Sequence, residues 1–198
     1  MTDQSRPVLL VLNAGSSSIK FSLYDATPQT EPRLQCIGNG SFEVHTDTER
    51  LVFQHTGSSA QKREDWPRNE ASPDSGTLFN LMDWIERHTD GQLCAAAHRI
   101  VHGGNRSEVA APVDAALMTE MQALGRAAPL HQPLCLAPIM YLAREHGGLA
   151  QFVLFHRRTQ TFRGRHPRRT TGGLMRHLRL RDSGQMSANL HSTQRYSS

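Results

Sequence analysis

The sequence predicts an α/β fold in which a mixed β-sheet carries flanking helices, and three patterns support this prediction. Residues 8–12 form a continuous apolar run, which is typical of a strand covered on both faces. Residues 19–24 then alternate apolar and polar side chains with the two-residue period of a strand. Residues 77–88 and 114–126 carry their apolar side chains at helical spacing. Strands followed by helices predict a sheet with helices packed against it.

The first part of the chain is predicted to be a meander of strands. After the two strands above, residues 34–43 and 51–55 have the composition of two more, so we expect four strands in succession. Residues 57–75 are polar and contain two prolines, which predicts a loop.

The next part is predicted to begin with a helix and return to the sheet. The helix at residues 77–88 is expected to take Asp74 or Ser75 as its N-cap and to bury Trp84. Residues 93–101 form an apolar run that leads directly into a pair of glycines, so we expect a strand that ends beside a flexible turn.

Two helices and a last strand are predicted before residue 156. The helix at residues 114–126 has Asp114 as a suitable N-cap. A second helix is expected to begin at residues 129–133 and to end near His146, before two glycines. Gln132 is a weak N-cap, so the start of this helix is expected to be weak. Residues 149–155 are predicted to form a last strand.

The charge distribution divides the chain into a lobe and a tail. Residues 1–150 carry 12 basic and 17 acidic side chains, whereas residues 151–198 carry ten arginines and one acidic side chain. The tail has no useful hydrophobic period, so we expect it to be disordered or to be an out-of-frame translation. A basic tail that binds nucleic acid is the alternative. The small number of aromatic side chains and the lack of a known module argue against nucleic acid as a partner.

The composition also indicates in which cellular compartment the protein is expected. No apolar run approaches the length of about 18 residues that a membrane span needs, and no apolar signal core follows the N-terminus. The three cysteines have neither metal-ligand spacing nor the pattern of a disulfide framework. These observations predict a cytoplasmic protein without a membrane partner.

The turn between the first two strands has the composition of a phosphate-binding turn. Residues 13–20 read Asn-Ala-Gly-Ser-Ser-Ser-Ile-Lys, in which small residues expose backbone amides and hydroxyl groups. Lys20 supplies a cation, and Asn13 can hold a phosphate oxygen or a metal-bound water. The spacing is not that of a P-loop. An ordinary serine- and glycine-rich hairpin is the alternative interpretation.

Arg99 lies near the predicted end of the strand at residues 93–101, where ligands bind in open α/β sheets. The planar guanidinium can hold a carboxylate through two hydrogen bonds and keeps its charge at neutral pH. A structural ion pair is the alternative role for a single arginine in a strand.

Three segments in the same order resemble the acetate and propionate kinases: residues 8–25, residues 98–104, which read His-Arg-Ile-Val-His-Gly-Gly, and residues 128–133, which read Ala-Pro-Leu-His-Gln-Pro. This family belongs to the actin-like ATPases. It usually has Asn at the position where this chain has Gln132. The resemblance covers residues 7–150 and implies a ribonuclease H-like N-terminal lobe, with a mixed sheet and flanking helices, that is incomplete. Enzymes of this family are much longer than this chain.

The resemblance implies a reaction of ATP with acetate or propionate to give ADP and an acyl phosphate. It implies that Asn13 is associated with Mg²⁺ (or Mn²⁺) and that ATP phosphates contact Ser16, Ser18 and Lys20. It also implies that the carboxylate is anchored by Arg99 beside an acyl pocket formed by Val101 and Leu130. The intact enzymes of the family imply a homodimer.

No catalytic residue is identified in this chain. The family's catalytic Asp lies in a Phe-Asp-Thr-Ala-Phe-His segment expected near residue 150, where residues 152–159 here read Phe-Val-Leu-Phe-His-Arg-Arg-Thr. The sequence therefore predicts a truncated kinase that is weakly active or inactive. The alternative is a catalytically dead fragment that acts as an interaction module.

Overall fold

The structure is a computed structural model that describes residues 6–29, 34–68, 73–89, 93–104, 108–126 and 128–155, without the side chains of residues 73–75. The strand β8 (Ala150–Phe155) extends across the predicted boundary at residue 150. The predictions for the remainder of the tail concern residues 156–198, which lie outside the described residues.

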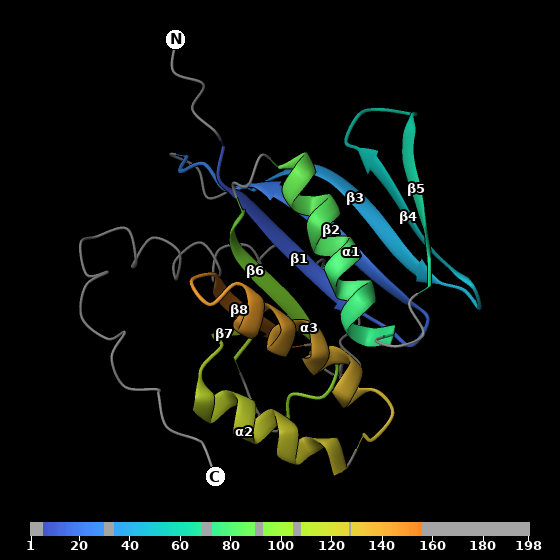
Figure 1. Cartoon of the computed structure of the whole chain (residues 1–198). Helices are drawn as coiled ribbons and strands as arrows, with labels where there is room; N and C mark the ends of the chain where they lie inside the picture. Colours follow the sequence, from blue (N-terminus) through green and yellow to red (C-terminus); the bar gives the residue numbers. More distant parts are fainter. Residues whose placement is uncertain are drawn as a thin grey trace, which may run out of the picture.

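The described residues form one mixed sheet of eight strands in the order β5-β4-β3-β2-β1-β6-β8-β7 (Figure 1). The first five strands make an antiparallel meander: β1 (Val8–Ala14), β2 (Ser18–Asp25), β3 (Gln35–Val44), β4 (Thr48–His55) and β5 (Gln61–Pro67). The strand β6 (Leu93–Ile100) is parallel to both β1 and β8, and β7 (Ala110–Pro112) is antiparallel to β8. The mixed sheet predicted from the sequence is confirmed.

Two edge strands were not expected from the sequence. The predicted loop at residues 57–75 is wrong, because β5 occupies residues 61–67 and a helix begins at Pro73. Most of the β5 side chains are exposed, so the strand lacks the alternating apolar pattern that reveals a half-buried strand. Its charged side chains are typical of an edge strand that must not pair with other proteins. The other edge, β7, has only three residues and includes Pro112.

The helices lie on one side of the sheet. Figure 1 shows α1 (Pro73–His88) and α3 (Gln132–Glu145) in front of the strands, with α2 (Ala115–Ala123) beside α3. The predicted helix at 114–126 is confirmed as α2 followed by a 3-10 turn at Leu124–Arg126. Asp114 caps α2 as predicted, because its carboxylate accepts a hydrogen bond of 2.7 Å from the backbone amide of Leu117.

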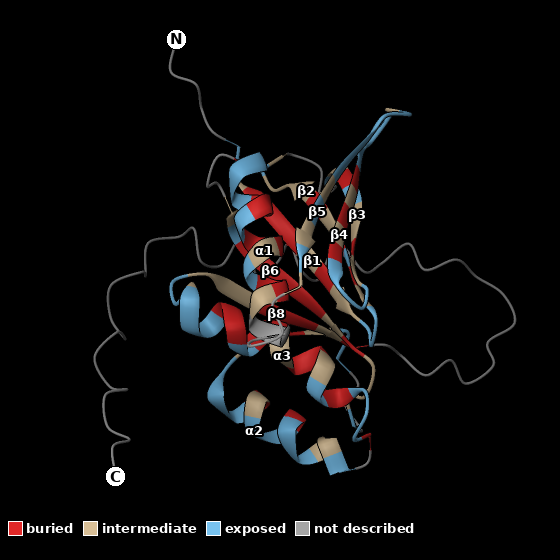
Figure 2. Cartoon of the chain, turned by 45° about the vertical axis from the view of Figure 1, so that its right-hand side comes forward, coloured by how far each residue is buried: buried red, intermediate tan, exposed pale blue. Residues whose placement is uncertain are grey.

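An aromatic cluster forms the centre of the core between α1 and the sheet. Trp84 is buried, as the sequence predicted, and its ring contacts Phe21 edge-on at 5.9 Å and Phe53 at 5.1 Å. Figure 2 shows that the buried residues of α1 face the strands. The cluster fixes α1 on the meander half of the sheet.

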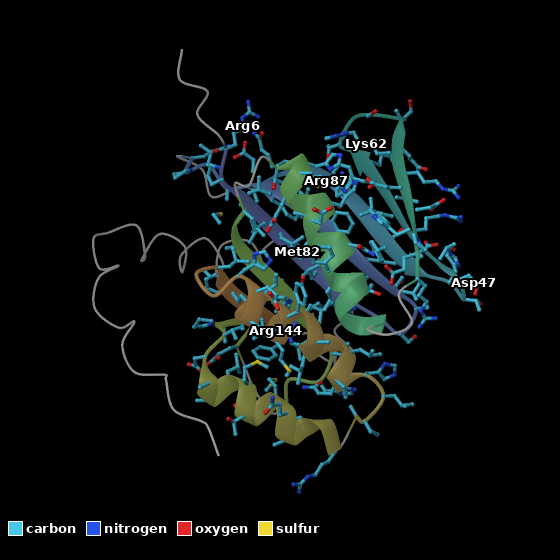
Figure 3. The ribbon with its side chains drawn as sticks, in the orientation of Figure 1. Arg6, Asp47, Lys62, Met82, Arg87 and Arg144 are labelled. Atoms are coloured by element: carbon cyan, nitrogen blue, oxygen red, sulfur yellow. The ribbon has the colours of Figure 1, made fainter. Side chains whose placement is uncertain are left out.

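Polar contacts also fix α1 to the last two strands of the meander. Glu49 of β4 is buried and accepts hydrogen bonds from Thr77 and, at 2.8 Å, from Asn80, both on α1. Near the other end of α1, Arg87 pairs with Glu64 of β5 at 3.1 Å, and Figure 3 shows Arg87 on the side of α1 that faces this hairpin.

The helix α3 begins without a side-chain cap. His131 is its N-cap residue and makes no capping hydrogen bond, which agrees with the weak start expected here. The side chain of Gln132, which was expected at the cap, is fully buried instead.

Candidate functional site

Two predicted site residues meet where the central parallel strands end. Asn13 is the next-to-last residue of β1, and Arg99 is the next-to-last residue of β6. A guanidinium nitrogen of Arg99, Nη1, donates a hydrogen bond of 3.3 Å to Oδ1 of Asn13. Both side chains are partly buried. The carboxyl ends of parallel strands are where open α/β sheets bind ligands.

The pleat of the strands places these residues on the sheet face opposite α1 and α3. Side chains alternate between the two faces of a strand, so Asn13 shares its face with Leu9 and Val11, and Arg99 shares its face with Ala95 and Ala97. These four apolar residues belong to a hydrophobic cluster that contains no residue of the helices. Lys20 of β2 is paired directly with Asn13 and therefore shares that face. The structure thus brings Asn13, Lys20 and Arg99 together.

Lys20 is exposed, and no ion pair joins it to a carboxylate among the described residues. Its ammonium group therefore remains available to a solvent-borne anion.

The turn between β1 and β2 is held in place by its own backbone. The amide of Gly15 donates to the carbonyl of Ser18 at 2.9 Å, and the carbonyl of Ser17 accepts from Val44 at 3.1 Å. Ser16 is exposed and Ser18 is partly buried, and these two predicted phosphate contacts lie four and two residues before Lys20. A fixed turn with exposed amides and hydroxyl groups can bind an anion without first being ordered.

The two residues predicted for the acyl pocket are placed differently. Val101 follows β6 and is half-buried against the cluster formed by α2, α3 and β8. Leu130 lies in the turn before α3 and is 78% exposed. The described residues therefore enclose Val101 but not Leu130.

Two buried residues of α3 support this end of the sheet and were not predicted as site residues. The thiol of Cys135 lies 3.9 Å from the carbonyl oxygen of Ala14, and burial raises its pKa. The amide of Gln132 donates to the carbonyl of His102 at 3.3 Å and to that of Met121 at 3.1 Å. These partners are distant in the sequence, so no sequence pattern could have revealed them.

The described residues suit a phosphate better than a metal ion held by the protein alone. They contain no group of three His, Cys, Asp or Glu side chains that could hold a metal. The oxygen of Asn13 already accepts a hydrogen bond from a cation, Arg99. Mg²⁺ is usually bound through carboxylates and substrate phosphates. A metal role for Asn13 therefore stays a prediction, whereas Lys20 and the serine turn have the chemistry that a phosphate needs.

The sequence matches one family over most of its length. The family model of the Acetokinase family matches residues 8–162. This chain belongs to the acetokinase family. The acetate kinase of Rhodopseudomonas palustris strain TIE-1 is 38% identical over 150 residues, which are 75% of this chain and 37% of that protein. Acetate kinase 2 of Neisseria meningitidis serogroup A is 31% identical over 147 residues, which are 34% of that protein.

Solved structures of the family confirm the fold. A propionate kinase from Francisella tularensis matches 75% of this chain with a TM-score of 0.61 and 24% identity. The acetate kinase of Porphyromonas gingivalis matches 75% with a TM-score of 0.59 and 21% identity. This chain covers 36% and 37% of those two proteins. The predicted actin-like lobe is therefore present, and it spans little more than a third of the length of these acetokinases.

The described part of this acetokinase chain includes no helix of the length and apolarity that a membrane crossing requires.

Proposed function

We propose that this chain supplies the carboxylate- and phosphate-binding side of an acetate kinase-like phosphotransferase, and that it turns over slowly or not at all as a 198-residue chain. The observation that carries the proposal is the meeting of Asn13, Lys20 and Arg99 at the ends of β1, β2 and β6 in a member of the acetokinase family.

Arg99 is the proposed anchor of the short-chain carboxylate. One nitrogen of its guanidinium donates to Asn13, which helps to orient the group at the strand end. A bidentate contact would hold acetate or propionate with one carboxylate oxygen free to act as the nucleophile. Val101 and Leu130 are proposed to face the acyl chain. A wall of this kind separates ligands by only about 1 to 3 kcal/mol per methylene, so it would distinguish acetate from propionate weakly.

The β1–β2 turn and Lys20 are the proposed contacts of the ATP phosphates. Phosphoryl transfer depends on positioning and on neutralising the charge of the phosphates, for which Mg²⁺ supplies further positive charge when it is bound. The ammonium of Lys20 and the hydroxyl groups of Ser16 and Ser18 would hold the phosphates within reach of the carboxylate at Arg99.

Slow turnover is proposed because the sequence offers no counterpart of the family's catalytic Asp and the chain covers only 37% of a related acetate kinase. Most of the acceleration of phosphoryl transfer comes from positioning and preorganised charge around the whole transferred group. A single lobe would provide one side of that environment. The expected homodimer and the preference between acetate and propionate remain predictions.

Trapping of acetyl phosphate with hydroxylamine tests the activity. The chain is incubated with ATP, Mg²⁺ and acetate beside the R. palustris acetate kinase as a control, and we expect it to reach less than a hundredth of the control rate. A rate within about tenfold of the control, a barrier difference of only about 1.4 kcal/mol, would contradict the proposed inactivity.

Binding is tested separately, because an inactive chain can still hold its ligands. We expect the backbone amide signals of Ser16 and Ser18 to shift on addition of ATP, and those of Arg99 and Val101 to shift on addition of acetate, in nuclear magnetic resonance (NMR) titrations. If both sets of signals stay unchanged at saturating ligand, the proposed binding function is wrong whatever the rate assay shows.

A further inference from the structure

A cavity of about 590 Å³ lies on the helical side of the molecule, between α1, α3 and the back of the β1–β2 turn. The helix α3 contributes apolar side chains to it, among them Leu134, Ala137 and Met140, and α1 contributes Leu78. Met140 is 52% exposed although it is apolar. The volume lies within the range of about 300 to 1,000 Å³ that small-molecule sites occupy.

This cavity is separate from the proposed substrate site. Neither Arg99 nor the proposed acyl-pocket residues line it, and Asn13 and Lys20 do not line it either. Those two residues and Arg99 lie on the opposite face of the sheet. The cavity and the phosphate site share only the turn that carries Ser16 and Ser18.

The charged side chains that line the cavity, among the described residues, are two arginines. Arg68 and Arg144 line it, and the described residues that line it include no Asp or Glu. Figure 3 shows Arg144 on α3. The polar remainder of the wall includes the serine hydroxyl groups of the β1–β2 turn, whereas the hydroxyl of Thr77 already donates to Glu49. An apolar wall with guanidinium groups and hydroxyl donors suits a ligand with an apolar body and one anionic end.

Arg144 keeps donors for such a ligand. Its Nε donates to Glu145 at 2.6 Å, and its guanidinium carbon lies 5.8 Å from the centre of the Tyr141 ring. Glu145 itself lines a neighbouring cavity of about 560 Å³, not this one. Only one of the five N–H donors of Arg144 is used in that ion pair. The Tyr141 ring, which lines both cavities as Arg144 does, lies against the guanidinium.

We propose that the cavity between α1, α3 and the β1–β2 turn binds an amphipathic monoanion, namely a linear acyl chain that ends in a carboxylate. The acyl chain would lie against Leu78, Leu134, Ala137 and Met140, and the carboxylate would lie at Arg68 and Arg144. The ligand contacts the turn that carries Ser16 and Ser18 from the side opposite to the phosphate site.

Isothermal titration of the full chain with hexanoate and octanoate, below their micelle concentrations, tests the ligand class. Burial of two more methylenes should tighten octanoate about 15-fold over hexanoate. The uncharged analogue 1-octanol should bind about tenfold or more weakly than octanoate, because it cannot accept charge-assisted hydrogen bonds from the arginines. Equal affinity for octanoate and 1-octanol would overturn the assignment of an anion.

Two variants locate the ligand, each with a matched control. Ala137→Trp fills the cavity and should abolish binding of both ligands, whereas Ala143→Trp, at an exposed position of α3 outside the cavity, should not. Arg144→Gln should weaken octanoate about tenfold and leave 1-octanol unchanged, while Arg126→Gln, at an exposed arginine outside the cavity, should change neither. Circular dichroism checks that each variant is folded.

Amide signals locate the ligand in the unmodified chain, so the proposal does not depend on a variant that folds. Octanoate should shift the signals of Ser17, Ala137 and Met140 and leave that of Gly125 unchanged, in NMR spectra. The proposal is overturned if octanoate binds Ala137→Trp as tightly as the unmodified chain, if the shifts map elsewhere, or if an acidic peptide binds here and octanoate does not.

Discussion

The guanidinium of Arg99 is hydrogen-bonded to the side-chain oxygen of Asn13 at 3.3 Å, although 86 positions separate the two residues in the sequence. The parallel pairing of β1 with β6, in which Leu12 is paired with His98, brings them together. Asn13 thus helps to orient Arg99. Arg99, the proposed carboxylate anchor on β6, is therefore held by Asn13 at the end of β1, the strand that leads into the proposed phosphate-binding turn.

Replacement of Arg99 by Lys should weaken acetate binding by about tenfold or more, because an ammonium keeps the charge but cannot make the bidentate contact. Arg99→Ala should abolish binding. NMR titration with acetate measures both, and Arg126→Lys, at an exposed position away from this strand end, is the control. Acetate affinity in Arg99→Lys equal to that of the unmodified chain would show that Arg99 has a structural role only.

The fold could be predicted from the sequence wherever burial leaves a pattern. The run at residues 8–12 and the alternation at 19–24 correspond to β1 and β2, which lie inside the sheet. The edge strand β5 escaped prediction because its Lys62, Arg63 and Asp65 are exposed. Its stability comes from pairing with β4 and from contacts such as the 2.8 Å ion pair of Asp65 with Arg50. Such partners are set by the fold and not by local sequence.

Replacement of Gln132 by Leu should destabilise the protein by about 1 to 3 kcal/mol, because it removes the donor to the buried carbonyls of His102 and Met121. The release of the His102 carbonyl should also speed amide hydrogen exchange at Val101 and Gly103. Urea unfolding and hydrogen exchange measure the two effects. Gln122→Leu, at an exposed position of α2, is the control. The role assigned to Gln132 fails if the two variants are equally stable.

The candidate site could be predicted only in part, for a physical reason that Gln132 shows. Residue types proposed to bind ligands directly, such as Arg99 and Lys20, are recognisable because a charged side chain interrupts or alternates with the apolar pattern of a strand. Gln132 acts on backbone carbonyls that any residue could supply, and its amide was expected to face a helix terminus. Leu130 shows a different difficulty. Its match to a position of the family predicted a pocket residue, but the match does not reveal that the side chain is exposed among the described residues.

Replacement of Gly40 by Ala should destabilise the protein by about 1 to 3 kcal/mol. A Cβ there would collide with the ring of Phe21 and would lie 2.8 Å from the carbonyl oxygen of Val52. The ring cannot move aside easily, because it stacks on Phe53 and contacts Trp84.

Gly148→Ala is the control for this prediction, because a Cβ at Gly148 meets no atom within 4 Å. It should change the stability by less than about 0.5 kcal/mol. Urea unfolding of both variants measures the difference. Equal stabilities would mean that β3 moves enough to make room for a Cβ at residue 40.

His98 should make the stability depend on pH. It is buried in β6, where its Nε2 lies 2.9 Å from Oε1 of Gln151, and its Nδ1 has no hydrogen-bond partner among the described residues. Since Oε1 can only accept, Nε2 carries the proton of the neutral ring, and a second proton would have to enter at the unpaired Nδ1. Burial lowers the pKa of His98 from 6.5 to about 4, against a smaller opposing effect of the Gln151 hydrogen bond.

Because the folded pKa is below the unfolded one, the unfolded state binds the proton first as the pH falls. Stability is therefore retained above pH 6.5 and lost between pH 6.5 and about 4, by about 2 kcal/mol at pH 4.5 relative to pH 7. Urea unfolding at the two pH values should show that His98→Gln loses this part of the pH dependence, even though the substitution lowers stability at pH 7. His131→Gln, at an exposed histidine, should keep it. If all three proteins lose the same free energy between pH 7 and pH 4.5, the burial of a neutral His98 does not control acid stability.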